Sequence, residues 1–290
     1  MSNPFISKWE GHEYLSSTGS INKVILAKLP LDGIEDKLVG KSAIDILGAK
    51  PLIEEIKKYA RDLEIDFHNN MEEKELPKYL SLCLQSSNPL VLATAERIVE
   101  KFGKRLGLIL LTLKLGEKEN QVVRNDWTEE MWSYWANVKT IFLVGGLVSG
   151  NLGERLKEVA YRLFWHAGVE PYEIVLVDYS AHAGVKGSAK LIEAKEGTNI
   201  LFDCGQTNIK RSIVTKENGQ VTNAIDLVSK MSLYVGADYN DEELKLEHAV
   251  KLHQYLLEVI SDTYYEASSY GAIGNEIVIS IANYTVGGRL

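Results

Sequence analysis

The sequence predicts an α/β protein, and three observations lead to this prediction. Between residues 140 and 195, short apolar runs alternate with amphipathic stretches in the β-α-β-α order of an α/β layer. Between residues 198 and 281, a hairpin is followed by a third strand, a long helix and a further strand. The 290 residues, 45% of them hydrophobic, are enough for one large domain or two of moderate size.

Residues 1–47 give the weakest secondary-structure signal of the chain. The stretch from Trp9 to Glu13 is a short polar and aromatic cluster, and a serine-rich segment follows it. This composition is typical of a surface loop with a half-buried tryptophan. Residues 24–29 are apolar enough to form a strand.

From residue 43 onward, apolar residues recur every three or four positions, which predicts helices. Pro51 fits the first turn of one of them, where its missing N–H costs nothing. Further helices are expected over residues 76–84 and 93–115. The second half of the latter is apolar nearly all round, so we expect it to be buried against a sheet.

Residues 117–138 interrupt this pattern with three tryptophans, Trp127, Trp132 and Trp135. Indole rings can form a stacking platform for a sugar ring. Tryptophans at such density more often pack in a core or form an oligomer contact. The sequence leaves these three interpretations open, and it favours packing or an oligomer contact over a sugar platform.

The remaining elements alternate regularly. Strands are expected over residues 141–144 and 174–177, with helices over 152–166 and 182–195. The hairpin spans residues 199–214, a third strand 219–228, a long helix 241–270 and a last strand 276–281. We place Asp203 and Cys204 in the hairpin turn with Gly205. Such a turn offers backbone N–H groups to phosphate oxygens or a metal-bound water. An ordinary hairpin, with Asp and Gly serving turn geometry, is the alternative.

Three motifs resemble those of the ROK family of sugar kinases and repressors. DCGQTNIK, from Asp203 to Lys210, resembles that family's phosphate-binding hairpin, D-x-G-G-T-x-x-K. FLVGGLVS, around Gly145 and Gly146, resembles its adenosine-side motif, and VDYSAHAGVKGSAKLIEA resembles its closing helix. The resemblance implies an actin-like, ribonuclease H-like ATPase fold of two lobes, ATP and Mg²⁺ as cofactors, and a hexose or amino sugar as substrate. Residues 1–197 would form the lobe that resembles the family's C-terminal half, with an insertion near residues 117–138. Residues 198–290 would form the lobe that resembles its N-terminal nucleotide-binding part.

The order of these motifs departs from the family. In the family the hairpin opens the chain and the Gly-Gly motif lies near its end, whereas here Gly145 precedes Asp203. The resemblance therefore implies a circular permutation, which compact domains tolerate because their termini often lie close together. Gln206 also replaces the family's second glycine, which affects how closely the backbone approaches a phosphate.

The resemblance assigns roles to particular residues. Asp203 would act through Mg²⁺ or its waters, and Gly145 and Gly146 would admit the adenine ribose. The phosphate contacts would be Gly205, Gln206, Thr207, Asn208 and Lys210, and the sugar contacts would be Glu10, His12, Glu13 and Asn283. Asn283 belongs to residues 282–290, which resemble either the family's sugar-side loop or its second phosphate loop, or are simply a chain end.

The family's catalytic aspartate lies in an N-D-A-N motif, which this sequence lacks. Phosphoryl transfer needs a base or orienting carboxylate at the sugar hydroxyl. Asp66, Asp178 or Asp262 could supply it, a partner chain could supply it, or the protein has lost catalysis and kept binding. The function is therefore either that of a sugar kinase or that of a non-catalytic binding or scaffold subunit.

Composition excludes several classes of function. The net charge is −8 and no Lys/Arg cluster exists, so nucleic-acid binding is not expected, and no helix-turn-helix precedes the family-like region. The two cysteines, Cys83 and Cys204, suggest a reducing compartment without disulfides. No apolar run reaches 18 residues, so we expect no membrane contact and a cytoplasmic location. A homo- or hetero-oligomer remains open.

Overall fold

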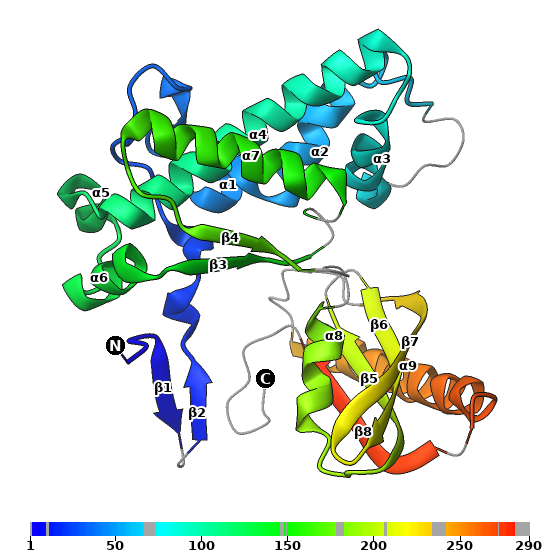
Figure 1. The fold of residues 1–290 in the computed structure, drawn as a ribbon. Coiled ribbons are helices and arrows are strands. Elements are labelled where there is room, and N and C mark those ends of the chain that lie inside the picture. Colours follow the sequence, from blue (N-terminus) through cyan, green and yellow to red (C-terminus); the bar gives the residue numbers. More distant parts are fainter. Residues whose placement is uncertain are drawn as a thin grey trace. The chain divides into compact units, whose positions relative to one another are not determined.

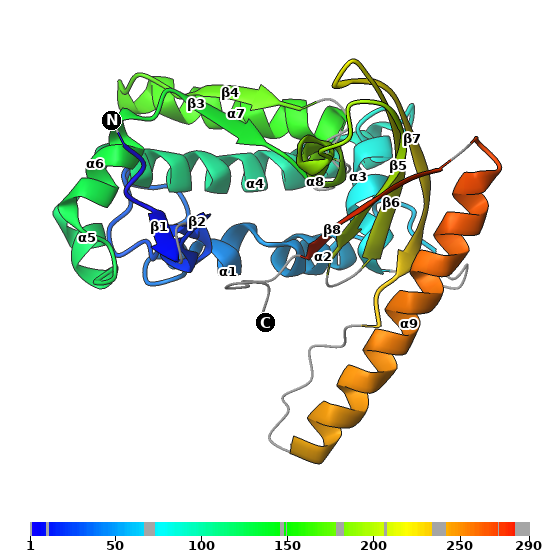
Figure 2. The ribbon, with the colours of Figure 1, turned by 90° about the horizontal axis from the view of Figure 1, so that it is seen from below.

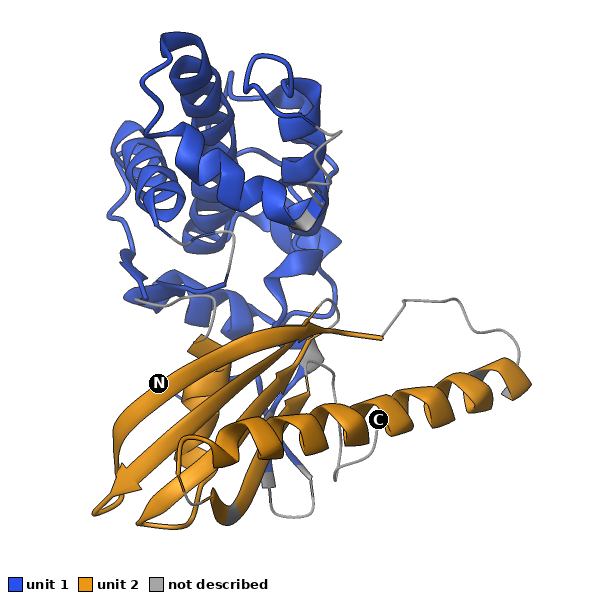
Figure 3. Cartoon of the chain, turned by 90° about the vertical axis from the view of Figure 1, so that its right-hand side faces the viewer, with its two compact units in different colours: residues 1–180 blue, residues 181–290 orange. Residues whose placement is uncertain are grey.

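The computed structural model describes residues 2–9, 12–66, 73–145, 148, 150–177, 183–205, 208–233, 242–271 and 273–281. It is an α/β protein, as the sequence predicts, and it forms two compact units, residues 1–180 and 181–290 (Figure 3). The division falls earlier than the predicted boundary at residues 197 and 198. The difference arises because helix α8 (Ala183–Ser188) packs on the strands of the second unit.

The first unit combines a group of helices with two short sheets (Figure 1). Its strands are β1 (Ile6–Trp9), β2 (His12–Leu15), β3 (Thr140–Leu143) and β4 (Glu173–Leu176). Its α-helices are α1 (Ala43–Leu47), α2 (Ala49–Lys58), α3 (Leu76–Cys83), α4 (Pro89–Leu115), α5 (Lys118–Val123), α6 (Glu129–Asn137) and α7 (Asn151–Ala167). Short 3₁₀ helices lie at η1 (Ser17–Gly19), η2 (Ile21–Lys23), η3 (Asp36–Leu38) and η5 (Glu73–Glu75).

The N-terminal segment differs from the prediction. Strands β1 and β2 pair as an antiparallel hairpin where a surface loop is expected. Residues 24–29 form no regular strand, and Ile25 makes only an isolated bridge with Ser42. Val24 and Leu26 are fully buried, so their hydrophobicity reflects core packing rather than a sheet.

Helices α4 and α7 pack closely and lie on one side of the parallel β3–β4 pair (Figure 1). The predicted helix over 93–115 begins earlier, at Pro89, because the Asn88 side chain accepts a hydrogen bond from the Leu90 N–H. Gly103 and Gly107 allow the close approach. A Cβ at Gly103 would lie 2.5 Å from the Val159 Cβ. The second half of α4 is buried, as predicted, but its main neighbour is α7 rather than a sheet.

The three tryptophans of residues 117–138 pack in the core of the first unit. Trp127 and Trp132 are 6% and 2% exposed, and their ring centroids lie 5.0 Å apart. Phe5 packs against Trp127 at 5.2 Å, and the Trp127 Nε1 donates to the Thr18 carbonyl oxygen. These rings therefore offer no open platform for a sugar, and the packing interpretation holds.

The second unit is a four-stranded sheet covered on both faces (Figure 2). Its strands are β5 (Gly197–Cys204), β6 (Asn208–Glu217), β7 (Gln220–Met231) and β8 (Ile273–Ile281), in the order β7-β6-β5-β8. Neighbouring strands are antiparallel except β5 and β8, which are parallel. Helix α9 (Glu242–Ser268) covers one face, and α8 with η8 (Ala189–Leu191) covers the other. The predicted order of hairpin, strand, helix and strand is confirmed.

One buried cation ties the α9 side of this unit together. The Arg211 side chain is 2% exposed and donates to the Val228 carbonyl oxygen and the Thr263 hydroxyl. It also pairs with Glu266 at 2.9 Å. A buried guanidinium is costly unless its donors are satisfied, so these contacts fix α9 on strands β6 and β7.

Candidate functional site

The candidate site in the second unit centres on Asp203. This residue is the second-to-last residue of β5 and does not lie in the hairpin turn. Asp203 pairs in register with Lys210 on β6 and with Ser280 on β8, and Cys204 pairs with Ile209. The prediction of Asp203 and Cys204 as turn residues is therefore wrong. Both strands extend farther because β8 supplies a second hydrogen-bonding partner for β5. Of the five predicted turn residues, Gly205 lies outside both strands, and residues 206 and 207 lie outside the described residues.

The register also decides the direction of Lys210, which the sequence leaves open. Opposite residues in a strand pair point to the same face of the sheet, so Lys210 lies beside Asp203. The Lys210 Nζ is 3.6 Å from the Asp203 Oδ2, and the two side chains are 32% and 20% exposed. The pair is partly open to solvent, so both groups remain accessible to a ligand.

Helix α8 brings a second sequence motif to Asp203. A Cβ built at Gly184 would lie 3.1 Å from the Asp203 Oδ2, so only glycine leaves the carboxylate its present space. Two residues farther along α8, the Lys186 Nζ lies 3.5 Å from the Asp226 Oδ2. The Ser212 hydroxyl donates to Asp226 at 2.7 Å. The result is a polar cluster of Asp203, Lys210, Lys186, Asp226 and Ser212 on the α8 face of the sheet.

The backbone at the hairpin turn is partly engaged within the turn itself. The Gly205 N–H donates to the Asn208 carbonyl oxygen at 3.0 Å. That N–H therefore points into the hairpin, and a phosphate would rely on other donors. Gln206 and Thr207 lie outside the described residues. Asn208 is the first residue of β6.

Cys204 is electrostatically linked to this cluster. Burial raises the pKa of the Cys204 thiol, and the neighbouring Asp203 carboxylate raises it further. The thiol is therefore protonated near neutral pH and is a poor nucleophile. Within the described part of the chain, no group of three or more His, Cys, Asp or Glu side chains could hold a metal. Asp203 alone could hold Mg²⁺ only together with waters and a ligand's phosphates.

The adenosine-side motif lies in the first unit, at the carboxyl end of β3. Gly145 has φ +105°, a conformation that strongly favours glycine. Gly146 lies outside the described residues. An apolar pocket of about 190 Å³ lies next to Gly145 and is lined by Leu143, Val144, Val148, Leu152 and six further residues of α1, α2, α4 and α7. Ligands of α/β proteins commonly bind beyond the carboxyl ends of parallel strands.

The predicted sugar contacts are not assembled into a site by the described residues. Glu13 is exposed and pairs with Lys8 at 3.2 Å. His12 is the first residue of β2, opposite Trp9. Glu10 and Asn283 lie outside the described residues.

Of the three candidate bases, only Asp262 lies in the same compact unit as Asp203 and is described by the structure. Asp262 lies on α9, where it pairs with Lys230 at 3.5 Å. Helix α9 packs on Phe202, whereas the neighbouring Asp203 contacts α8. Successive strand residues point to opposite faces, so Asp262 and Asp203 lie across the sheet from each other, and Asp262 is wrong as the base. Asp66 is an exposed residue of the first unit, and Asp178 lies outside the described residues.

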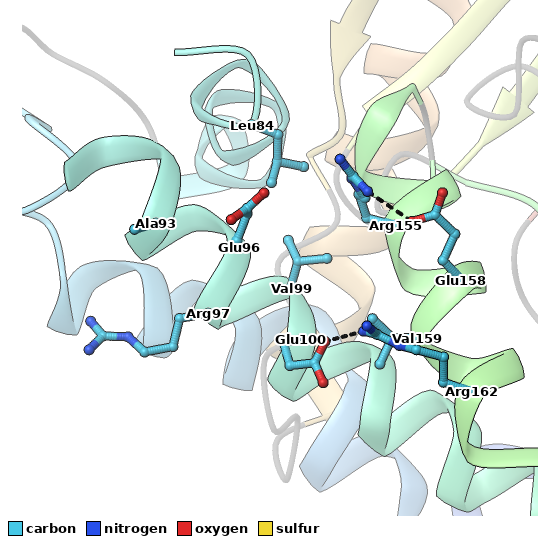
Figure 4. Close-up of a pocket in the computed structure, with 10 residues that line it drawn as sticks. All are labelled: Leu84, Ala93, Glu96, Arg97, Val99, Glu100, Arg155, Glu158, Val159 and Arg162. Carbon is cyan, nitrogen blue, oxygen red and sulfur yellow. Dashed lines mark hydrogen bonds and ion pairs between the residues drawn. The ribbon is translucent and has the colours of Figure 1, made fainter. Parts of the chain in front are cut away.

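Sequence reasoning missed a charged groove between α4 and α7 (Figure 4). It has a volume of about 460 Å³ and carries three arginines and three glutamates: Arg97, Arg155, Arg162, Glu96, Glu100 and Glu158. Arg155 pairs with Glu158 at 3.0 Å, and Arg162 pairs with Glu100. The charges largely neutralise one another, and none of the predicted site residues lines this groove.

Comparison with protein-family models, with curated proteins and with solved structures finds no match to this chain. Among the helices that the structure describes, none combines the length and the hydrophobicity needed to cross a bilayer.

Proposed function

We propose that this chain is an ATP-dependent sugar kinase of the ROK type, with an actin-like fold in circularly permuted order. It would act in the cytoplasm, bind Mg·ATP and transfer the γ-phosphate to a hydroxyl of a hexose or amino sugar. The proposal rests on the three sequence motifs and on the geometry around Asp203.

The observation that carries the proposal is the meeting of two motifs at one carboxylate. Asp203 of the hairpin contacts Gly184 of the small-residue helix and pairs with Lys210. A carboxylate at a strand end, with a lysine beside it and no side chain above it, suits a water-bound Mg²⁺ on a polyphosphate. On ligand binding, Lys210 would exchange Asp203 for a phosphate oxygen.

The apolar pocket beside Gly145 gives separate support. Its lining by Leu143, Val148 and Leu152 suits a flat, weakly polar ring such as adenine.

The proposal is tested by calorimetric titration of the full chain with Mg·ATP, followed by ATP consumption against a panel of hexoses and amino sugars. We expect binding that Asp203→Ala reduces at least tenfold, and turnover that the same variant abolishes. Adenosine should still bind Asp203→Ala, because that variant leaves the first unit unchanged. Absence of Mg·ATP binding by the wild type would refute the proposal.

A non-catalytic or split protein is the second candidate, and two observations favour it. The Gly205 N–H is engaged within the hairpin, and Asp262 lies across the sheet from Asp203. This candidate predicts ATP or sugar binding without turnover by the single chain. Turnover restored by a co-purifying partner chain would indicate a split kinase, and continued inactivity would indicate a binding or scaffold subunit.

A further inference from the structure

Helix α9 carries a second apolar stripe besides the one it buries against the sheet. Val259, Thr263 and Ala267 are buried. Leu246, Val250, Leu257 and Tyr264 lie on another side of the helix and are 68%, 50%, 54% and 47% exposed. Together with His253 and with Ile260, which is partly buried against the sheet core, these residues occupy alternating four- and three-residue spacings, which is the heptad pattern of a helix–helix seam.

The stripe faces the β8 side of the sheet, which α9 covers only in part. Tyr255 donates to the Met231 carbonyl oxygen and Asp262 pairs with Lys230, so that side of α9 faces β7. At 100° per residue, the stripe lies roughly opposite those two residues and therefore faces the β8 side.

Strand β8 continues the apolar surface. Ile277 and Ile279 pair in register with Ile200 and Phe202, which α9 covers, so they point to the α9 face of the sheet. Ile277, Ile279 and Ile281 are nevertheless 41%, 46% and 48% exposed. With the stripe, they form what we call the α9–β8 surface: Leu246, Val250, Leu257, Tyr264, Ile277, Ile279 and Ile281.

Seven large side chains, each about half exposed, present on the order of several hundred Å² of apolar area, as much as the largest patch on a typical monomer. The angle between a helix and a sheet accommodates a second helix, because helices pack side by side at about 8–10 Å. Covering this area on both copies at once would approach a standard interface of about 800 Å² per partner.

We propose that the α9–β8 surface binds a second copy of this chain, with the two α9 helices antiparallel across a two-fold axis. In this seam, Leu246 of one copy lies opposite Tyr264 of the other, Val250 opposite Ile260, and His253 opposite Leu257. The two residue numbers of each pair average to 255, which places the two-fold axis at residue 255. Residue 255 is also the midpoint of Glu242–Ser268, so an antiparallel partner overlaps the whole helix. Such a self-complementary surface is what a two-fold dimer requires.

Charge favours the antiparallel arrangement over the parallel one. In a parallel pair, Glu243 and Glu247 would lie next to the same residues of the other copy, and like charges side by side are destabilising. In the antiparallel pair, those acidic ends are far apart. Glu247, Gln254 and Ser261 flank the seam, each one position after a seam residue. There, Glu247 of one copy lies opposite Ser261 of the other, and the two copies of Gln254 lie opposite each other.

The first test is sedimentation velocity on the full chain over a range of concentrations. We expect a dimer, and we expect Leu257→Glu to weaken dimerisation at least 100-fold while the circular dichroism spectrum stays unchanged. The matched control is Val228→Glu, because Val228 is 79% exposed but lies on β7 outside the surface. A monomeric wild type, or a dimer that Leu257→Glu leaves intact, would overturn the proposal.

Orientation is tested by cross-linking with a short bismaleimide in a Cys204→Ser background, where the remaining Cys83 is buried. Gln254→Cys is expected to give a covalent dimer. Glu243→Cys is expected to give none, because its two copies would lie about 36 Å apart at 1.5 Å per residue. Cross-linking at both positions would indicate a parallel pair and contradict the antiparallel arrangement, and cross-linking at neither would contradict the α9 seam.

Discussion

Gly184 has no side chain, and this leaves space for the Asp203 carboxylate. Gly184 and Gly187 belong to the same short helix, yet only Gly184 approaches the carboxylate. A Cβ at Gly187 would meet nothing within 4 Å. The two glycines therefore form a natural pair for separating a role at the site from a role in the helix.

We predict that Gly184→Ala lowers the affinity for Mg·ATP at least fivefold, whereas Gly187→Ala leaves it unchanged. Both changes add the same methyl group to a helix, where alanine is favoured over glycine by about 1 kcal/mol. Only the first forces the Asp203 carboxylate to move. Calorimetric titration of the two variants measures the difference, and equal affinities would show that the Gly184 contact does not matter for binding.

Tyr172 provides a prediction about alkaline pH. Burial raises the pKa of Tyr172 well above its usual value of 10.0, and its hydroxyl donates to the Trp135 carbonyl oxygen at 2.9 Å. The phenol is neutral in the folded and unfolded states below about pH 10. Above that pH the unfolded state loses the proton first, so the free energy of unfolding falls as pH rises.

We expect Tyr172→Phe to cost about 1 kcal/mol at pH 7 through the lost hydrogen bond. The difference in the free energy of unfolding between wild type and variant should become smaller between pH 10 and 11. The wild type loses stability there as unfolded Tyr172 ionises, whereas phenylalanine has no proton to lose. Urea unfolding at pH 7, 10 and 11 measures it. A gap that stays constant over this range would show that Tyr172 ionises alike in both states.

At the scale of elements, most helices and strands follow from the apolar pattern of the sequence. The long helices α4, α7 and α9 and all four strands of the second unit are predicted, because their periodicity persists over many residues. The N-terminal hairpin is not predicted, since β1 and β2 contain only four residues each. Such short strands show too little alternation to distinguish them from a loop.

The candidate site was predicted less completely than the elements around it. The sequence pointed to Asp203 and Lys210, but their pairing depends on a strand register that β8 helps to set from 70 residues away. The contact with Gly184 depends on how α8 packs on the sheet. Neither relationship is encoded in a local pattern, because both arise from tertiary contacts.

The packing of α4 on α7 gives a prediction at the same scale. Gly103→Ala should destabilise the first unit by about 1–3 kcal/mol through overpacking against Val159, although alanine favours an isolated helix. Val159→Gly in the same chain should restore part of that loss, because the two residues compete for one space. Thermal unfolding of the wild type, the two single variants and the double variant gives the coupling free energy between positions 103 and 159. Additive effects of the two changes would show that these residues do not compete for one space.

At the scale of the whole molecule, each compact unit has a core of its own. The largest cluster of buried apolar residues lies within residues 5–174, and the other two lie within residues 185–267. Each sheet face of the second unit is covered by a helix of the same unit. This organisation predicts two units that unfold separately.

We predict that residues 181–290, produced alone, unfold in one cooperative transition. Phe202→Ala should lower the stability of this fragment by about 3–5 kcal/mol and should lower the corresponding transition of the full chain equally. Phe164→Ala, in the first unit, should shift only the other transition of the full chain. Chemical denaturation followed by circular dichroism tests this, and a single transition shifted by both changes would contradict it.

The parallel pairing of β5 with β8 has a consequence for biosynthesis. Strands β5, β6 and β7 leave the ribosome in succession and can pair as hairpins within microseconds. Strand β8 is made about 40 residues after β7, which at 5–20 residues per second takes about 2–8 s. During that interval the β8-facing edge of β5 carries backbone groups without their final partner. The strand edge that contains Asp203 is therefore the last part of this sheet to acquire its partner strand.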